Sequence, residues 1–361
     1  MAARGLIGHE FDWQWVMEKN IITAALPFNN IVLRVIHMAK TGRRILIALG
    51  GNAIKQAHEK GTAEEQFKNV ATTSENIVKI LQELNREDRL IITHGNGPQS
   101  GNLALQQDIA KNEIPPQPLD VVGAMTQGQI GYMLQNTMEN IMAAKGMKIQ
   151  VVSLVNQVLV DRNDPEFVGE NASKPVGNFL TEEEAMKLKA EKGWIVKKVK
   201  PNAPKPWRRT VPSPDPIANV EAEAVKMLVN AGAVVIASGG GGIPVVKENG
   251  RLVGVEAVID KDLAGERLAE VVEADIFLIL TDIEKAKLNF GKPNEASIDR
   301  MTVTEAKKYL SEGHFLAGSM GPKVKACIRF LEWGGKEAII TSLDKGADAI
   351  EGRAGTVITR G

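Results

Sequence analysis

The sequence predicts an α/β protein whose mostly parallel sheet is covered by helices on both faces. Two observations indicate this fold. From Arg44 onward, short apolar and β-branched runs alternate with longer amphipathic stretches, which is typical of parallel strands joined by crossover helices. The short runs are also almost continuously apolar, as expected for strands that are buried on both faces of a parallel sheet.

Each element is assigned from its own pattern. The expected strands are the apolar runs at residues 44–49, 90–93, 149–155, 234–237, 276–280 and 338–341. The expected helices have apolar residues at helical spacing, at residues 64–85, 101–111, 123–144, 181–192, 218–231, 262–273 and 304–311.

Composition excludes several classes of protein. The chain has 361 residues, enough for one large or two ordinary domains, and its 43% apolar and 24% charged residues are typical of soluble globular proteins. Lys and Arg number 44, and so do Asp and Glu. Without excess positive charge, we expect no nucleic-acid partner. No apolar run reaches the roughly 20 residues of a membrane span, so we expect no membrane partner either.

The only cysteine is Cys327. It excludes a disulfide within the chain and a multi-cysteine metal site, and it suits the reducing cytoplasm, where we expect the protein to work. Val324, Cys327, Ile328 and Leu331 recur at helical spacing, so we interpret Cys327 as core packing, with a catalytic thiol as the minor alternative.

Two segments depart from the alternating pattern. Residues 1–37 have no compact hydrophobic segment and no small-residue cleavage site, whereas a core strand follows soon after Met38. We expect an atypical extension outside the core fold, with a mitochondrial-type presequence as the minor alternative.

Residues 161–216 are rich in proline and charge around one helix. We expect a protruding subdomain or lid at about 161–210, with a surface linker as the alternative. A second lobe, residues 218–361, should follow a first one at 38–217.

Four expected strands end in glycine-rich or acidic turns. These turns are Gly50-Gly51-Asn52, Gly95-Asn96-Gly97, Ser238-Gly239-Gly240-Gly241 and Thr281-Asp282. In open α/β sheets ligands bind beyond the carboxyl ends of the strands, so we expect the four turns to meet in one crevice. Glycine lets backbone N–H groups approach phosphate oxygens closely, although tight-turn geometry alone could explain each turn singly.

The better-known phosphate signatures are absent. Gly95, Gly97 and Gly101 are spaced G-x-G-x-x-x-G, unlike the dinucleotide fingerprint, and there is no Walker motif and no protein-kinase motif set. A protein that moves phosphate with this sequence must use another arrangement.

Three lysines suggest that arrangement. Lys261 lies between Asp260 and Asp262, where we expect a strand to enter a helix; Lys323 follows a glycine turn at another helix start. Lys174 lies in the proline-rich segment. A single lysine is usually a solvated surface residue. Phosphoryl transfer, however, depends mainly on positioning and on cations that stabilise the transferring oxygens.

Taken in order, these motifs resemble the carbamate kinases of the amino acid kinase superfamily. The resemblance runs from Arg44 to the C-terminus through ALGGNA, THGNGPQ, KPVG, WRRTVPSPDP, ASGGGG, VIDKDLA, ILTD and GSMGPK. It implies a three-layer αβα sandwich with a small protruding subdomain. It also implies a cytoplasmic homodimer that transfers phosphate between ATP and carbamate, giving ADP and carbamoyl phosphate, with Mg²⁺ held mainly by the nucleotide phosphates. The first lobe would bind carbamate and the second the nucleotide.

The resemblance also implies roles for single residues. The catalytic set would be Lys174, Lys261, Asp262 and Lys323. Carbamate and the migrating phosphate would be held by Gly50, Gly51, Asn52, Gly95, Asn96 and Gly97. The nucleotide side would include Ser238, Gly239, Gly240, Gly241, Thr281, Asp282, Met320 and Gly321.

Two alternatives stay open. One is a kinase of the same superfamily acting on another small acid, such as N-acetylglutamate; those relatives typically carry a lysine in the first glycine loop, where this chain has Ala53. The other is a nucleotide-binding regulator without turnover. The sequence departs from the family pattern before Trp207, in residues 197–206, which leaves the local geometry of the lid open.

Overall fold

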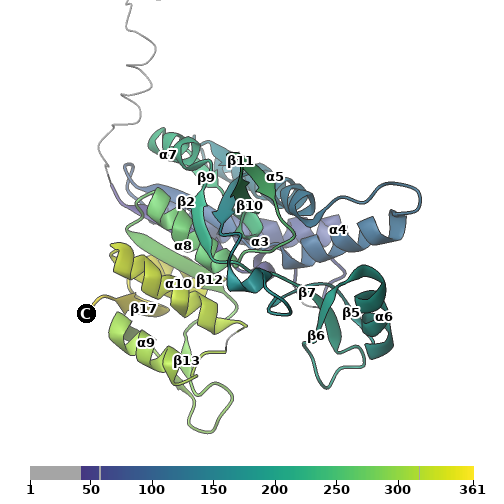
Figure 1. Cartoon of the computed structure of the whole chain (residues 1–361). Helices are drawn as coiled ribbons and strands as arrows, with labels where there is room; N and C mark the ends of the chain where they lie inside the picture. The colour runs from purple at the N-terminus through teal and green to yellow at the C-terminus, as the bar shows by residue number, and fades with distance from the viewer. Residues whose placement is uncertain (1–41, 57, 317) are drawn as a thin grey trace, which may run out of the picture. The chain divides into compact units, whose positions relative to one another are not determined.

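The computed structural model describes residues 42–56, 58–316 and 318–361, all within one compact unit. The expectation for residues 1–37 therefore lies outside the described residues. Figure 1 shows the arrangement of the described elements.

The main sheet of the described residues has eight strands, in the order β15-β17-β16-β12-β1-β2-β9-β3. Neighbouring strands are parallel except for β16 and β17, which are antiparallel. The strands are β1 Arg44–Leu49, β2 Arg89–His94, β3 Val151–Ser153, β9 Val234–Ile236, β12 Ile276–Thr281, β15 Arg300–Thr302, β16 Glu337–Ser342 and β17 Thr356–Thr359.

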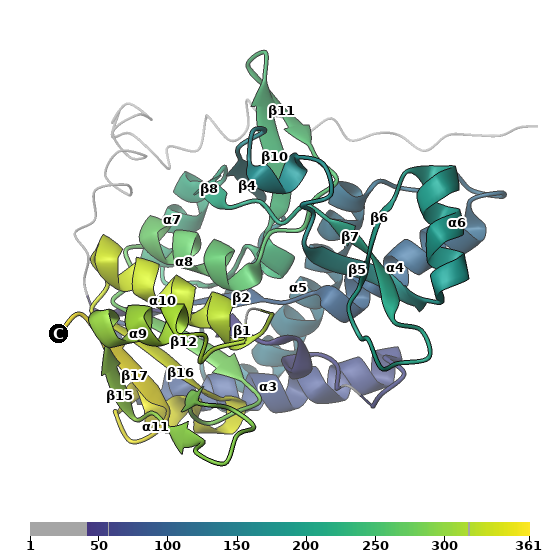
Figure 2. The same cartoon turned by 60° about the horizontal axis from the view of Figure 1, so that its bottom comes forward.

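Helices cover both faces of this sheet, which confirms the αβα sandwich (Figure 2). Side chains of β1 alternate between the two cores: Leu46 and Ala48 face one, and Ile45, Ile47 and Leu49 face the other. The first core is covered by α7 Ala222–Asn230, α8 Lys261–Val271, α9 Val303–Ser311 and α10 Met320–Trp333. The second is covered by α3 Ala63–Glu83, α5 Leu119–Ala144 and α11 Gly346–Ile350.

Helix boundaries follow local signals. Thr62 caps α3 and exchanges hydrogen bonds with Glu65 in a capping box that satisfies the first-turn N–H groups. Cys327 is fully buried on α10, so its prediction as core packing is confirmed. The helix expected from residue 218 begins only at Ala222, because residues 216–219 form strand β8.

A second sheet packs beside the first and was not expected. Its order is β11-β10-β4-β8, and its strands are β4 Gln157–Val160, β8 Pro216–Asn219, β10 Ile243–Glu248 and β11 Arg251–Gly254. The short strands β13 Lys287–Leu288 and β14 Ala296–Ser297 form a hairpin.

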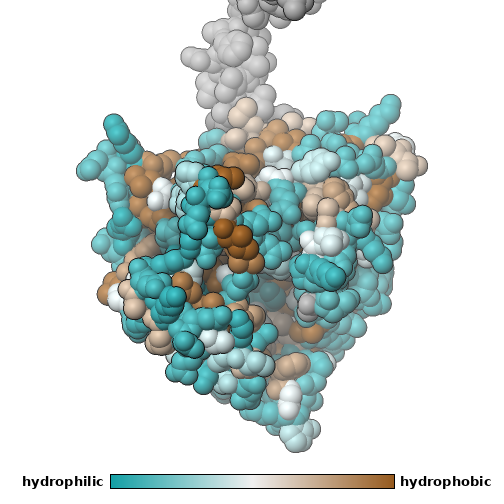
Figure 3. Space-filling model, turned by 90° about the vertical axis from the view of Figure 1, so that its right-hand side faces the viewer, coloured by the Kyte–Doolittle hydropathy of each residue, from teal (hydrophilic) through white to brown (hydrophobic). Residues whose placement is uncertain are grey.

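The proline-rich segment folds as a small sheet with a helix. Its strands, in the order β5-β7-β6, are β5 Lys174–Leu180, β6 Ile195–Lys198 and β7 Trp207–Val211, and α6 Glu182–Lys192 packs on them. No strand was assigned to this segment from its sequence, in which only the helix was expected. The subdomain stands to one side of the main sheet, beside α4 Gly97–Ala110 (Figure 1). The surface on that side is mostly hydrophilic, with a few hydrophobic patches (Figure 3).

The division into two lobes at residue 218 stays a prediction. Strand β9 follows that point in the chain, yet it lies between β2 and β3 in the same sheet. Among the described residues, no helix has the length and apolar character of a membrane span.

Candidate active site

The carboxyl ends of β1, β2 and β12 open onto a cavity of about 820 Å³. As predicted, the turns after these strands meet there: Gly50 to Asn52, Gly95 to Gly97, and Thr281-Asp282 all line it. Gly240 adds the fourth turn, and the four residues of the predicted catalytic set, Lys174, Lys261, Asp262 and Lys323, line the same cavity. Residues from seven separate parts of the sequence thus share one cavity.

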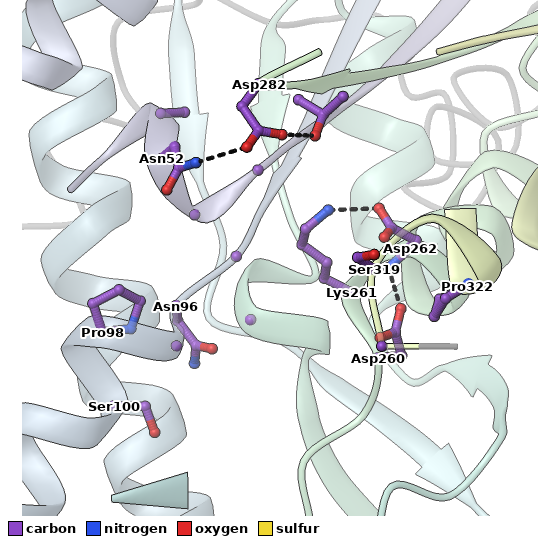
Figure 4. Close-up of a pocket in the computed structure, with 18 of the residues that line it drawn as sticks. Asn52, Asn96, Pro98, Ser100, Asp260, Lys261, Asp262, Asp282, Ser319 and Pro322 are labelled. Atoms are coloured by element: carbon purple, nitrogen blue, oxygen red, sulfur yellow. Dashed lines mark hydrogen bonds and ion pairs between the residues drawn. The ribbon is translucent and has the colours of Figure 1, made fainter. Parts of the chain in front are cut away.

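The N-terminus of α8 organises the charged wall of the cavity (Figure 4). Asp260 caps this helix: its Oδ1 accepts a hydrogen bond from the Asp262 N–H at 2.9 Å. The residues between β11 and Asp260 belong to no strand, which corrects the expectation of a strand there. Capping fixes the first turn of α8, so Lys261 and Asp262 leave the helix in defined directions.

Two lysines share the Asp262 carboxylate. Lys261 Nζ lies 2.5 Å from Oδ1 and Lys323 Nζ, from the first turn of α10, lies 2.9 Å from Oδ2. Asp262 is 3% exposed. Burial by itself would raise the pKa of its carboxyl, but the two ammonium groups lower that pKa to about 2. With both lysines protonated, the trio carries one net positive charge at the cavity wall.

Within this trio the pKa values of the two lysines shift in opposite directions. Burial lowers the pKa of Lys261. The Asp262 carboxylate raises this pKa and the charge of Lys323 lowers it, and the net shift is downward. Burial also lowers the pKa of Lys323, but the attraction of Asp262 outweighs it, so the pKa of Lys323 lies above its usual value.

Lys174 reaches the cavity from β5 and is bound to the α8 cap. Its Nζ lies 2.9 Å from Asp260 Oδ2. Lys174 is the first residue of β5, and its ammonium group lines the same cavity as those of Lys261 and Lys323.

The backbone amides of the glycine turns divide into two groups. The Gly50 N–H donates to Leu280 O at 2.9 Å and the Gly95 N–H to Leu49 O at 3.1 Å, so these two groups extend the sheet and cannot hold an anion. The N–H groups of Gly51 and Asn52, at the start of the 3₁₀ turn Gly51–Ala53, and of Gly97, the first residue of α4, have no acceptor within the described part of the chain. These three remain available for a ligand.

The turn after β9 is buried and contributes one residue to the cavity lining. Of its predicted nucleotide-binding residues only Gly240 lines the cavity, whereas Ser238, Gly239 and Gly241 lie outside its lining. Ser238 is buried with a left-handed φ of 53°, and its N–H donates to Asn156 Oδ1 at 2.6 Å. A Cβ at Gly239 would come within 2.4 Å of His94 Nε2. These residues fix the turn and do not face the ligand space.

His94 is buried beneath the turns. Burial lowers its pKa to about 4, so its ring is neutral at physiological pH, and its Nδ1 lies 3.0 Å from Gly95 O. It packs the glycine turns together and carries no charge into the cavity.

A smaller cavity of about 190 Å³ adjoins the first, since Thr281, Asp282, Ser319 and Lys323 line both. Phe290, Phe315, Leu316 and Met320 make its wall largely apolar, with His314 beside them. Met320 thus lies here, whereas Gly321 lines neither cavity. Asp282 accepts a hydrogen bond from Thr281 Oγ1 at 3.0 Å and contacts Asn52 Nδ2 at 3.5 Å, which ties the β12 turn to the β1 turn.

Sequence reasoning missed Arg208. This residue of β7 lines the larger cavity, and its Nε and Nη2 donate to Gly177 O at 3.1 and 2.8 Å. It braces the β5 strand that carries Lys174. Two arginines are adjacent in WRRTV, and the sequence does not distinguish them. In the structure Arg208 lines the cavity, whereas Arg209 pairs with Glu256 outside it.

Glycine turns at the ends of parallel strands, together with paired lysines, fit proteins that transfer phosphate between small molecules. Comparison with known proteins defines the class: the model of the amino acid kinase family matches residues 43–342, most of the chain.

Individual relatives narrow the assignment. The carbamate kinase of Thermococcus kodakarensis is 55% identical over 320 residues, 88% of this chain and 99% of the relative, and that of Pyrococcus furiosus is 53% identical over 319 residues, with the same shares covered. The solved structure of carbamate kinase from Giardia lamblia bound to AMP-PNP is 43% identical, with a TM-score of 0.82, covering 89% of this chain and 99% of that one. The chain therefore belongs to the carbamate kinases of the amino acid kinase family, and it is an enzyme.

Proposed function

We propose that this enzyme catalyses reversible phosphoryl transfer from ATP to carbamate, giving ADP and carbamoyl phosphate. The observation that carries this proposal is the pair Lys261 and Lys323, which converge on one buried carboxylate at the edge of the glycine-lined cavity. A transferring phosphoryl group spreads negative charge over its oxygens, and preorganised cations stabilise that charge without moving during the reaction.

The acceptor would bind against the free amides. Gly51, Asn52 and Gly97 offer N–H groups to the carbamate carboxylate or to the arriving phosphate. Transfer would then be direct, from the nucleotide to the acceptor oxygen in line, without a covalent enzyme intermediate. Lys174 would contribute from β5, once it exchanges the Asp260 carboxylate for the phosphate.

The nucleotide would extend from the larger cavity into the smaller one. The apolar wall of Phe290, Phe315 and Met320 suits a purine ring. Thr281, Asp282 and Lys323 line both cavities, so the phosphates of a nucleotide bound in this way would reach Lys323.

Magnesium would arrive with the nucleotide. Among the described residues no group of three or more histidine, cysteine or acidic side chains could hold a metal ion. Asp260 and Asp262 are engaged by lysines. This donor set fits a Mg²⁺ held mainly by phosphate oxygens, where it would neutralise part of their charge.

The test is an assay of ATP formation from ADP and carbamoyl phosphate with Mg²⁺, coupled to a reporter reaction. We expect turnover that stops when Mg²⁺ is chelated. Folded protein that forms no ATP would refute the proposal. Faster phosphorylation of N-acetylglutamate than of carbamate would assign the other small-acid activity instead.

We further propose that the enzyme works as a cytoplasmic homodimer. Apolar side chains exposed on β11, an edge strand, offer one surface for a second copy; they include Leu252 and Val253. Light scattering after size-exclusion chromatography should give twice the mass of the 361-residue chain, and a monomer at micromolar concentration would contradict the dimer.

A further inference from the structure

The Asn96 side chain has an orientation that its hydrogen bonds impose. Its Nδ2 donates to Thr126 Oγ1 at 2.9 Å, and Thr126 Oγ1 donates to Gly123 O at 2.6 Å. A hydroxyl has a single proton. Since Thr126 uses that proton on Gly123, it can only accept from Asn96, so the amide nitrogen and not the oxygen must face it.

Gly240 holds the amide in place from the other side. A Cβ at residue 240 would lie 2.1 Å from Asn96 Nδ2 and 2.8 Å from its Oδ1, so the backbone of Gly240 packs directly on the amide. Gly240 is itself buried in a turn with φ of 67°, which Ser238 anchors to Asn156. The amide cannot rotate without disturbing this turn.

The remaining atom of the amide, Oδ1, faces the cavity. Asn96 lines the larger cavity, its Oδ1 has no hydrogen-bond donor within the described ranges, and Figure 4 shows the oxygen pointing toward the side that carries Lys261. The adjoining residue, Gly95, lies against the Lys261 stem and the Gly51 backbone nitrogen. A fixed hydrogen-bond acceptor thus stands among the donors of an anion site.

An ionised carboxylate or phosphate cannot pair with such an acceptor, because its oxygens accept hydrogen bonds and it has no N–H group to donate. Carbamate differs in one group: its –NH₂ is conjugated with the carboxylate, so its nitrogen donates hydrogen bonds and does not accept them. The shape of the site, donors on one side and one acceptor on the other, matches the two ends of this molecule.

We propose that Asn96 Oδ1 accepts a hydrogen bond from the –NH₂ group of carbamate or carbamoyl phosphate and selects these compounds over analogues that carry a methyl group there. This proposal rests on the proposed function. An acetyl group would leave the Asn96 oxygen facing a methyl group, and a polar group left without a partner disfavours the wrong ligand.

The experiment compares two phosphoryl donors of nearly equal shape, carbamoyl phosphate and acetyl phosphate, as sources of ATP from ADP. For each, kcat/KM is measured with the wild-type enzyme, Asn96→Ala, Thr126→Val and, as a matched control, Asn102→Ala. Asn102 is an exposed residue of α4, the helix that follows Asn96, and lies outside the cavity lining. We expect the ratio of kcat/KM for carbamoyl over acetyl phosphate to fall about tenfold in Asn96→Ala.

The Thr126→Val variant tests the same hydrogen bond without changing Asn96, so the proposal stays testable if Asn96→Ala misfolds. Thr126→Val keeps Asn96 but removes the acceptor that orients it, so the ratio should fall by an intermediate factor, whereas Asn102→Ala should keep the wild-type ratio. Equal losses with both donors in Asn96→Ala, or an unchanged ratio in both variants, would overturn the proposal. A wild-type enzyme without carbamoyl phosphate activity would instead overturn the proposed function, so the two failures are distinguishable.

Discussion

The ammonium group of Lys174 and the first turn of α8 share one carboxylate, that of Asp260. Its Oδ2 lies 2.9 Å from Lys174 Nζ, and its Oδ1 accepts the Asp262 N–H at 2.9 Å. The side chain of Asp260 therefore connects the subdomain to the helix that carries Lys261 and Asp262.

Replacing each partner should separate the two roles of Asp260. Asp260→Ala removes the cap of α8, so we expect a loss of about 1 kcal/mol in the free energy of unfolding. Lys174→Met keeps the cap and removes only a partly exposed ion pair, which should change stability by less than about 0.5 kcal/mol. Urea denaturation of both variants measures the difference, and equal losses would mean that the ion pair, not the cap, stabilises this junction.

Removing either lysine of the trio should slow catalysis. We expect Lys261→Ala or Lys323→Ala to lower kcat by roughly 100- to 1000-fold, the effect of losing one preorganised electrostatic donor. Lys226→Ala, on the exposed side of α7, is the matched control and should retain wild-type kinetics. Near-normal turnover in both trio variants would exclude these lysines from the chemistry.

The Asp262 carboxyl should contribute stability that depends on pH. Its pKa falls from 3.8 to about 2 on folding. The contribution is then complete above about pH 4 and is lost as the pH falls toward 2, because the folded state holds the ionised form more strongly. We expect the stability difference between wild type and Asp262→Asn to shrink by about 2 kcal/mol over that range. Denaturation at pH 2, 3, 4 and 6 measures it, and a constant difference would contradict the assignment.

Glu266 should have the opposite effect at higher pH. Fully buried on α8, it lies 3.7 Å from Arg267 Nε, beyond hydrogen-bonding distance. Burial raises its pKa from 4.5 to about 8, and the neighbouring Glu270 adds to the rise. Folded protein thus keeps a proton that unfolded protein releases above about pH 4.5, so stability declines between that pH and 8.

Glu266→Gln removes this titration while preserving size. The variant should match wild type near pH 4.5 and exceed its stability by at least ~1 kcal/mol at pH 8. Thermal or urea unfolding at four pH values tests this expectation. Parallel stability curves for the two proteins would show that Glu266 does not titrate in this range.

The main sheet could be predicted because its strands are buried on both faces. Runs such as Ile276–Thr281 are apolar at nearly every position, so pattern alone marks them. The subdomain could not be predicted in this way: β5 begins with Lys174-Pro175 and β7 with Trp207-Arg208, and both strands are only half-buried. Strands packed on one helix at the surface show too little apolar alternation to stand out.

The candidate site was predictable where a motif carries its own chemistry, as in the sequence around Lys261. Its supporting network was not. Gln127, Asn156 and Asn219 are buried and joined by hydrogen bonds, yet they lie 29 and 63 residues apart in sequence. No local pattern identifies an amide whose partners come from three different elements.

The contact between Gly240 and the Asn96 amide has a consequence for how such sequences can diverge. Any side chain at position 240 would occupy the space of that amide. Shortening residue 96 would free that space but would not make position 240 replaceable, because its φ of 67° strains any residue other than glycine. We therefore expect Gly240 to be retained by relatives even where residue 96 differs, so acceptor preference can change through residue 96 alone.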